Sequence, residues 1–292
     1  MPFCSNCGTE LVEDAKYCPS CGVPVYPLVA EADRRTQSKT KRKKISTLSL
    51  VLIIVVPVAI LLLLSSMFFL GSWFPFGVVG SGNLVTEEML FTGFTSVDAG
   101  NGFRVEITKS NSYNLMVTAD DNVMEYIEIT QSGNTLIIGL KGGYSFWSTT
   151  MKAEIAMPEL YSLTLSGGAQ GKLEDYNSIY PFSLELSGGS TLRGEFETPE
   201  NVDFSLSGGS RLLGFVGAAK NLSLGASGGS QVEISDFFVH NADVHLSGGS
   251  RATINLDGIL DANLSGGSNL SYFGDATLGK IQTTSGSEIT KK

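Results

Sequence analysis

A seven-residue phrase recurs through the second half of the chain: an apolar residue, any residue, an apolar residue, and then Ser-Gly-Gly-Ser. Between the last residues of successive copies, the steps are 21, 20, 20, 20, 18 and 19 residues. The copies end at Ala169, Ser190, Ser210, Ser230, Ser250, Ser268 and Ser287, and the first and last are imperfect. A nearly constant period of this length indicates stacked units of similar structure, none of which buries its apolar face alone.

The spacing inside the phrase indicates β-strands. Apolar residues two apart, such as Leu184 and Leu186, put one face of a strand inward and leave Glu185 outward. The Gly-Gly pair permits positive φ, so the chain can turn a sharp corner in two residues. Alternation resumes two residues after each phrase, at Leu192, Leu212, Val232, Ala252, Leu270 and Ile289.

These coils predict a mainly β fold, a parallel β-helix over residues 83–292, and the general right-handedness of parallel crossovers makes a right-handed β-helix the expectation. Each strand would pair with its equivalent one coil away, at a spacing of roughly 4.8 Å. A β-propeller would need about twice the period, and the Asn or Cys position of a leucine-rich repeat is missing. Residues 83–160 show less regular alternation, so we expect them to form the first coils and the cap that a solenoid needs. Within them, Asp120-Asp121-Asn122 is expected to cap one helical turn that runs to Tyr126.

The N-terminal segment, residues 1–26, contains all four cysteines of the chain. Cys4 and Cys7 form one C-x-x-C pair and Cys18 and Cys21 the other, with ten residues between the pairs. Such pairs place four thiolates for a tetrahedral Zn²⁺ site, which would be structural because no coordination position is left for water. Two disulfides are the alternative, and they require an oxidising compartment. The segment resembles the short zinc ribbons at the N-termini of many prokaryotic membrane proteins.

Residues 27–44 form a polar linker that ends in a basic run, and residues 45–70 then offer 26 positions without a charge. A hydrocarbon core needs about 20 apolar residues, so this stretch predicts one transmembrane helix. The basic run can be interpreted as a nucleic-acid patch or as a positive-inside signal, and the adjoining apolar stretch favours the second. Seven Lys or Arg residues lie between Arg34 and Lys44, and none lies from Gly71 to Phe103. We therefore expect a cytoplasmic N-terminus, an interfacial linker at 71–82, and an extracytoplasmic repeat domain.

Charge is distributed unevenly along the chain. Residues 1–46 carry a net charge of +3 and residues 71–292 a net charge of −12. An acidic body argues against nucleic acid as the partner of the large domain. That domain also contains no cysteine, so it could enter an oxidising space without forming disulfides.

Four stretches carry a resemblance to a known family: Gly80–Glu88, Gly93–Val97, Ala119–Asn122, and Met157–Leu160 together with the repeated Leu-Ser-Gly-Gly-Ser. In combination they resemble the head GIN domain of autotransporter adhesins, over about residues 83–290. The resemblance implies a right-handed parallel β-helix at the cell surface and supplies no catalytic residues. The zinc ribbon and the apolar span depart from a secreted autotransporter.

Two outward columns of the predicted β-helix are the candidates for a site. Residues directly after the phrase form one column, and residues between its two apolar positions form the other. The first column comprises Gln170, Thr191, Arg211, Gln231, Arg251, Asn269 and Glu288, and the second Thr164, Glu185, Ser205, Gly225, His245, Asn263 and Gln282. Neither gathers the carboxylates of a calcium site, as a polysaccharide-cleaving β-helix would need. Each column is either a solvated face or a polar groove for a glycan.

The remaining residue patterns are weaker evidence for a functional site. His240 and His245 are the only histidines, and with Asp243 nearby they show no spacing typical of a nucleophile and its base. Asn221, Asn263 and Asn269 stand in Asn-x-Ser sequons, which matter only in a host that glycosylates its exterior.

Three functions follow from these observations. The leading hypothesis is a non-enzymatic, membrane-anchored adhesion or binding module whose partner is an envelope glycan or another cell-surface ligand. The second is an envelope sensor that signals through the zinc ribbon, and the third is a polysaccharide-degrading enzyme. Oligomeric state is not encoded in any pattern that we can identify.

Overall fold

The computed structural model describes residues 3–12, 15–24 and 77–292, which fall into two compact units divided near residue 71. In the first unit, isolated bridges join Phe3 to Glu10 and Tyr17 to Pro24. The predicted linker 27–44, the predicted span 45–70 and residues 71–76 lie outside the described residues. Within the described ranges, no helix has the length and apolar character needed to cross a membrane.

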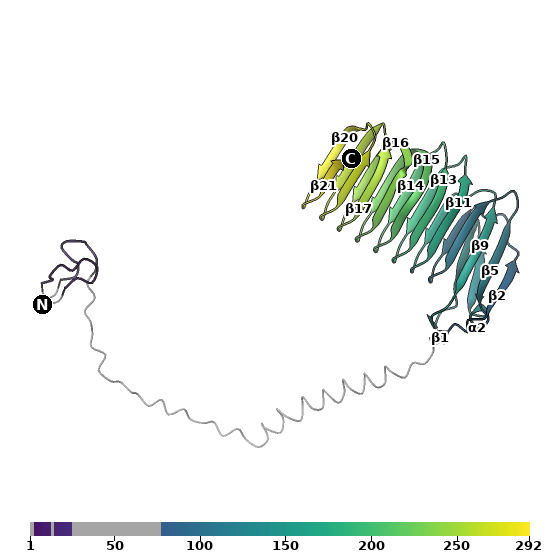
Figure 1. The fold of residues 1–292 in the computed structure, drawn as a ribbon, viewed down its shortest axis with the longest axis horizontal. Helices are drawn as coiled ribbons and strands as arrows, with labels where there is room; N and C mark the ends of the chain where they lie inside the picture. The colour runs from purple at the N-terminus through teal and green to yellow at the C-terminus, as the bar shows by residue number, and fades with distance from the viewer. Residues whose placement is uncertain (1–2, 13–14, 25–76) are drawn as a thin grey trace, which may run out of the picture. The chain divides into compact units, whose positions relative to one another are not determined.

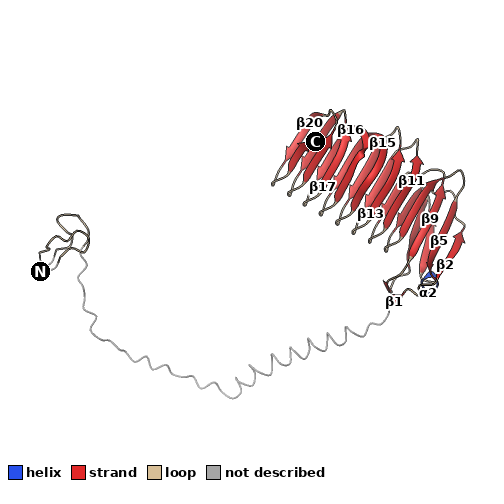
Figure 2. Ribbon diagram, viewed as in Figure 1, coloured by secondary structure: helices blue, strands red, loops and turns tan. Residues whose placement is uncertain are grey.

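The second unit is a β-solenoid (Figure 1), in which strands account for nearly all of the regular structure (Figure 2). Its parallel strands line up in two columns, which we call the first face and the second face. The first face, which leads into the corners, consists of β7 (Thr135–Leu140), β3 (Ser96–Ala99), β10 (Ser162–Leu165), β12 (Phe182–Leu186), β14 (Val202–Leu206), the ends of β15 (Arg211–Ala226) and β16 (Gln231–Leu246), β18 (Ile259–Leu264) and β20 (Thr277–Thr283). The second face consists of β9 (Met151–Met157), β4 (Arg104–Lys109), β11 (Gln170–Asn177), β13 (Thr191–Glu197), the starts of β15 and β16, β17 (Arg251–Leu256), β19 (Asn269–Phe273) and β21 (Glu288–Lys291).

The register of these parallel strands follows the phrase. Leu184 pairs with Phe204, which pairs with Leu224, so each copy of the phrase stacks on the next. The predicted mainly β solenoid is therefore confirmed, while its right hand stays a prediction.

The core lies between the two faces and contains a column of aromatic rings that the repeated phrase does not predict. Tyr176, Phe196, Phe215 and Phe237 are each no more than 1% exposed. Successive ring centroids are 6.0, 6.5 and 5.4 Å apart. Burial of each such side chain contributes about 1.5–3 kcal/mol, so successive coils are joined through their interior as well as through their strand edges.

The corner is formed by the glycines and serines of the phrase. At Gly208 and Gly209 φ is 63° and 75°, in the left-handed region that glycine enters without steric cost. A Cβ on Gly208 would lie 3.1 Å from the backbone nitrogen of Gly188 in the previous coil, so a side chain here would force the stacked corners slightly apart. The last serine closes the turn from inside: the Ser230 hydroxyl is buried and donates to the Ser227 carbonyl at 2.7 Å.

The N-terminal part of the solenoid departs from parallel coiling. β2 (Leu84–Met89) and β9 both pair antiparallel with β5 (Asn114–Asp120), and β6 (Ile127–Ser132) forms an antiparallel hairpin with β7. The less regular first coils that we expected are thus partly replaced by antiparallel strands, at the end of the solenoid where the sequence predicted a cap. A further pair, β1 (Gly77–Val79) and β8 (Ser145–Trp147), forms a separate two-stranded sheet, so strand structure begins inside the predicted linker 71–82.

The expected helical turn is present as α2 (Asp121–Met124), but its capping differs from the expectation. The side chain of Asp120, the N-cap residue, makes no capping hydrogen bond. Its carboxylate oxygens instead accept from the backbone N–H groups of Gly82 and Thr150, both at 2.7 Å. These bonds are the main reason that the pKa of Asp120 is lowered, the one from Thr150 contributing most. Asp120 therefore joins the entering chain to the body of the solenoid.

Candidate functional site

The described residues present two candidate sites, one in each unit. In the first unit the sulfur atoms of Cys4, Cys7, Cys18 and Cys21 all lie within 4.8 Å of one another. Cys4 and Cys21 are 3.7 Å apart and Cys7 and Cys18 are 3.5 Å apart, and all four are free thiols, so the alternative of two disulfides is not the arrangement found. A tetrahedron with Zn–S bonds of about 2.3 Å has edges of about 3.8 Å, so this geometry fits zinc.

The turns at the two C-x-x-C pairs have the same backbone hydrogen bond and the same glycine conformation. Gly8 donates its backbone N–H to the Cys4 carbonyl and Gly22 to the Cys18 carbonyl, each at 2.8 Å. Both glycines have φ of 72°, which the reversal after each cysteine pair requires. The hydroxyl and then the backbone N–H of Thr9 lower the pKa of Cys7 to about 6. The two glycines therefore shape the turns beside the sulfurs.

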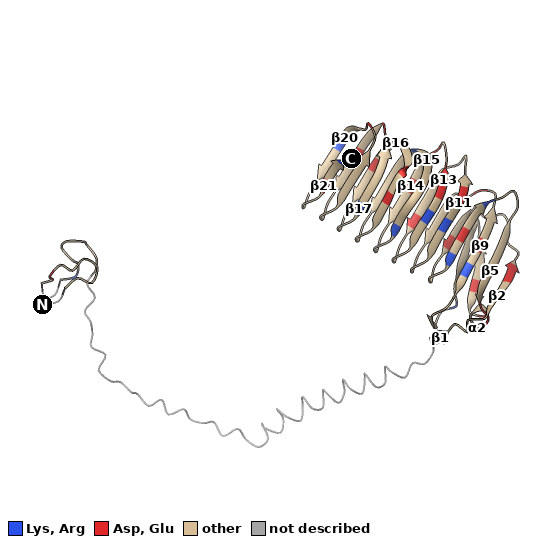
Figure 3. Ribbon diagram, in the orientation of Figure 1, with Lys and Arg blue, Asp and Glu red and all other residues tan. Residues whose placement is uncertain are grey.

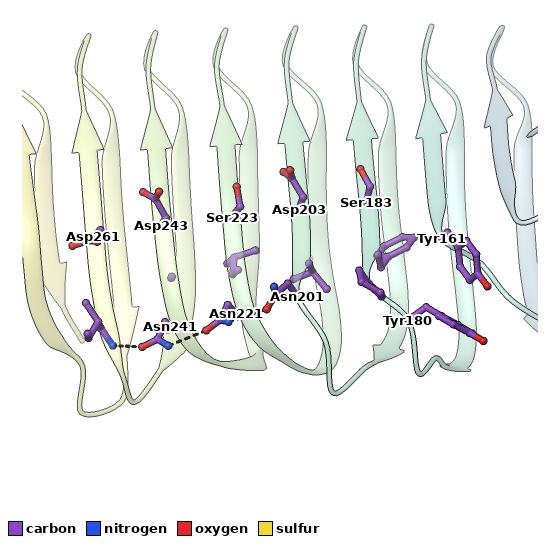
Figure 4. A pocket seen from close by; sticks show the side chains of 16 residues that line it. Tyr161, Tyr180, Ser183, Asn201, Asp203, Asn221, Ser223, Asn241, Asp243 and Asp261 are labelled. Carbon is purple, nitrogen blue, oxygen red and sulfur yellow. Dashed lines mark hydrogen bonds between the residues drawn. The ribbon is translucent and has the colours of Figure 1, made fainter.

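The second candidate is a groove of about 850 Å³ on the first face of the solenoid (Figure 4). It runs across five coils, and one wall is the column of outward side chains nearest the start of each first-face strand. That column consists of Ser183, Asp203, Ser223, Asp243 and Asp261. Four coil steps of roughly 4.8 Å make the column about 19 Å long.

The opposite wall is an asparagine ladder. The amide of Asn221 donates to the side-chain oxygen of Asn201, and the amide of Asn241 donates to Asn221, both at 2.8 Å. The Asn241 oxygen then accepts from the backbone N–H of Ile259 at 2.7 Å (Figure 4). Because each amide is held by its neighbour, the wall is rigid and repeats once per coil.

Two tyrosines close one end of the groove. The rings of Tyr161 and Tyr180 are 4.8 Å apart and tilted by 54°, and their side chains are 37% and 40% exposed. The groove lining contains three carboxylates and no lysine or arginine. Basic side chains instead mark the strands of the second face, among acidic ones (Figure 3). They are Arg104, Lys109, Lys152, Lys172, Arg193, Arg211, Arg251 and Lys291.

The two predicted outward columns exist in the register that the repeat indicated. Arg211 pairs with Gln231 and Gln231 with Arg251 on the second face, while Glu185, Ser205 and Gly225 follow one another on the first. The groove lies beside the second column rather than on either one. The signal that could have found it is the recurrence of Asn at 201, 221 and 241, together with Asp at 203 and 243.

The remaining predicted residues are spread over the surface. His240 lies 2.8 Å from Asp257 and His245 lies 3.5 Å from Asp243, and both imidazoles are more than half exposed. The two histidines therefore contact different carboxylates. Of the sequon residues, Asn221 is part of the asparagine ladder, Asn263 is exposed on the first face, and Asn269 is half-buried on the second.

In comparison with known proteins, each unit matches a described family or domain. Residues 93–276 match the family described as "Putative auto-transporter adhesin, head GIN domain", and residues 3–25 match a zinc-ribbon domain. No curated protein matches the chain.

Solved structures share the solenoid fold. A protein from Bacteroides fragilis described as a putative adhesin has a TM-score of 0.65 and 19% identity, and the match covers 74% of this chain and 100% of that one. A protein from Parabacteroides distasonis described as a putative lipid binding protein has a TM-score of 0.60 and 19% identity, covering 74% and 99%. A putative adhesin from Parabacteroides merdae has a TM-score of 0.57 and 16% identity, with the same coverage.

Proposed function

The chain belongs to the family described as "Putative auto-transporter adhesin, head GIN domain", and on this premise we propose that it is a membrane-anchored, non-enzymatic module that binds a linear envelope glycan. The observation that carries the proposal is the groove on the first face. It crosses successive coils and presents equivalent polar groups once per coil, which suits a ligand that itself repeats.

The chemistry of the groove favours a sugar polymer over other ligands. Carboxylates, serine hydroxyls and amides hydrogen-bond to sugar hydroxyls, and the exposed rings of Tyr161 and Tyr180 offer apolar faces on which a sugar ring can stack. Asp203, Asp243 and Asp261 repel polyanions, because no basic side chain lines the groove. We therefore propose a neutral or amine-bearing glycan as the ligand.

The test is retention of the full chain, in detergent, on insoluble glycans of three kinds: neutral, amine-bearing and uronate-rich. Retention on the first two and not on the third is expected. Tyr180→Ala and Asp203→Asn should each weaken binding about 2–13-fold, the range that 0.5–1.5 kcal/mol per contact allows. Ile179→Ala is the matched control, because Ile179 is 67% exposed beside Tyr180 and lies outside the groove lining. Equal retention of Tyr180→Ala, Asp203→Asn and wild type would refute the groove as the site.

The anchor and orientation belong to the same proposal. The uncharged stretch 45–70 supports one membrane span, and the seven basic residues that precede it support a cytoplasmic N-terminus with the solenoid outside the cell. Protease added to intact cells that carry a tag at each end of the chain should remove the C-terminal tag and spare the N-terminal one. Protection of both tags would refute surface display.

The four cysteine sulfurs support a structural Zn²⁺ in the cytoplasmic ribbon. The ligands we propose are Cys4, Cys7, Cys18 and Cys21, which leave no coordination position for substrate. Zinc would thus maintain the fold of the ribbon and take no part in chemistry.

A further inference from the structure

A small aromatic surface lies at the end of the solenoid where the described chain enters, near α2 (Figure 1). It consists of Val79, Tyr126, Tyr144, Phe146 and Trp147, and we call it the aromatic platform: Val79 and Trp147 pair and lie on the outer side of the β1/β8 sheet, while Phe146 lies on the side that packs against the solenoid. The side chains of Trp147, Val79 and Tyr144 are 65%, 60% and 45% exposed. A solvent-facing group of this kind on a soluble surface marks a contact site.

Each side of the platform is held by its own contacts. Tyr126 lies 4.6 Å from Tyr144 and 5.7 Å from Phe146, centroid to centroid. The Trp147 indole packs against Gly77, where an added Cβ would be 3.2 Å from the ring. Phe146 also packs against the core of the solenoid, so the exposed rings rest on a fixed base.

The chain that enters the platform is clamped to the body by three consecutive side chains. Asp120 accepts from the Gly82 N–H, and the Ser81 hydroxyl donates to the Asp121 carboxylate. The Asn122 amide donates to the Val79 carbonyl at 2.8 Å, and its oxygen accepts from the Ser81 N–H at 3.0 Å. Strand β1 is thus attached at its end as well as by its pairing with β8, and the platform cannot swing away from the solenoid.

The platform is uncharged within an acidic domain. Residues 77–80 contain no charge and residues 141–150 contain one lysine and no acid, although residues 71–292 carry a net charge of −12. The acidic side chains beside it are Asp120 directly before α2, Asp121 within α2 and Glu125 directly after it, and Lys141 contacts the Glu125 carbonyl at 2.5 Å. Tyrosine and tryptophan without net charge are the composition that proteins place at the lipid headgroup level.

Chain length keeps this surface close to the proposed membrane span. Six residues, 71–76, separate Leu70 from Gly77, and they include Trp73, Phe74 and Phe76. Whatever their conformation, the seven steps from Leu70 to Gly77 reach at most about 23–25 Å. Gly77, which packs against Trp147 of the platform, therefore remains within that distance of the end of the proposed span.

We infer that the aromatic platform rests on the outer lipid headgroups and so fixes how the solenoid stands on the membrane. The inference depends on the proposed anchor at 45–70. Its occupant is a lipid surface, because the platform is neutral, aromatic and tethered next to the bilayer.

The test uses tryptophan fluorescence, because Trp73 and Trp147 are the only tryptophans of the chain. The full chain with Trp73→Phe is reconstituted into phosphatidylcholine vesicles, with or without brominated acyl chains. We expect Trp147 emission to shift to shorter wavelength, to be quenched by the brominated lipid, and to become several-fold less accessible to iodide than in detergent. As the matched control, a chain with Trp73→Phe, Trp147→Phe and Phe238→Trp places the indole at a 41% exposed position on the solenoid, where iodide should quench it fully.

The outcomes separate the inference from the anchor. If the chain fails to float with the vesicles, the anchor is refuted and the inference with it. If the chain floats but Trp147 stays open to iodide and is not quenched by brominated lipid, the platform inference is overturned while the anchor holds. Shielding that disappears on dilution of the protein in the bilayer would also overturn it, in favour of contact with a second copy.

Discussion

At the scale of single residues, buried polar groups hold the turns and joints of the solenoid. Ser190, Ser210, Ser230, Ser250 and Ser268 are each no more than 1% exposed, although serine normally lies at the surface. From Ser210 onward the hydroxyl donates to the carbonyl three residues earlier, and Ser190 donates to Leu165 of the previous coil. The shape that recurs at each corner therefore depends on the serine hydrogen bonds as well as on the glycine pair.

Replacing Ser230 with alanine tests the hydroxyl. The change leaves the Ser227 carbonyl without this donor and should lower the free energy of unfolding by about 0.5–1.5 kcal/mol. Urea unfolding followed by far-UV circular dichroism gives the value. Ser205→Ala, on the exposed side of β14, should change it by much less, and equal losses for both variants would contradict the assignment.

Asp120 should make stability depend on pH. Its pKa is lowered in the folded state by the backbone N–H groups of Thr150 and Gly82, so its contribution is present above the ordinary carboxyl pKa of about 3.9. That contribution is lost as the pH falls through the lower folded value. Asp120→Asn should therefore be less stable than wild type at pH 7, and the difference should shrink as the pH is lowered below about 4. The measurement is urea unfolding of both proteins at each pH. A difference that stays constant with pH would show that the carboxylate charge does not matter, and Asp236→Asn serves as the exposed control.

At the scale of elements, each corner stacks on its neighbour through glycine. Every first glycine of the pair from Gly188 to Gly266 would bring a Cβ to within 3.0–3.2 Å of the glycine nitrogen one coil earlier. Each also has φ between 60° and 64°. Both the backbone conformation and the close approach therefore require glycine.

Gly208→Ala isolates this requirement. The left-handed conformation should cost about 1–2 kcal/mol in alanine, and the contact with Gly188 adds to that cost. Gly225→Ala is the control, because its φ is not in the left-handed region and an added Cβ would meet no atom within 4 Å. Chemical unfolding should show a loss for the first variant and little change or a small gain for the second. Similar effects would mean that the corner tolerates a side chain.

The sequence predicted those elements whose partners lie one period away. The strands, their parallel register and the outward columns follow from a repeat of about 20 residues, because equivalent positions stack on each other. The antiparallel pairing of β2 and β9 with β5 was not predicted, since these segments are not copies of one repeat and no local pattern specifies which of them pair. The role of Asp120 was missed for a similar reason, because its two partners come from distant parts of the chain. In the candidate sites, the four cysteines were predicted from their spacing alone. The asparagine ladder appears in the sequence only as Asn residues that recur every 20 positions, a pattern that matches no known motif.

At the scale of the whole molecule, the two units have separate cores. Cys4, Leu11 and Cys18 form the small buried cluster of the first unit, and the solenoid core begins at Phe94. A cluster of this size cannot stabilise a fold, so the ribbon should depend on its metal. The solenoid, with dozens of buried apolar side chains, has no such need.

Removing zinc should therefore unfold one unit and leave the other intact. The purified full chain should contain one zinc ion, and a strong chelator or Cys7→Ser should unfold residues 3–24, seen as rapid proteolysis and as thiols that react with an aromatic disulfide reagent. The thermal unfolding of the solenoid, followed by far-UV circular dichroism, should keep its midpoint, because among the described residues the buried cluster of each unit belongs to that unit alone. Cys7→His, which keeps a zinc ligand, should protect the ribbon partly. A lower midpoint for the solenoid after chelation would show that the units stabilise each other, and resistance of the ribbon to both chelator and Cys7→Ser would show that its fold does not depend on zinc.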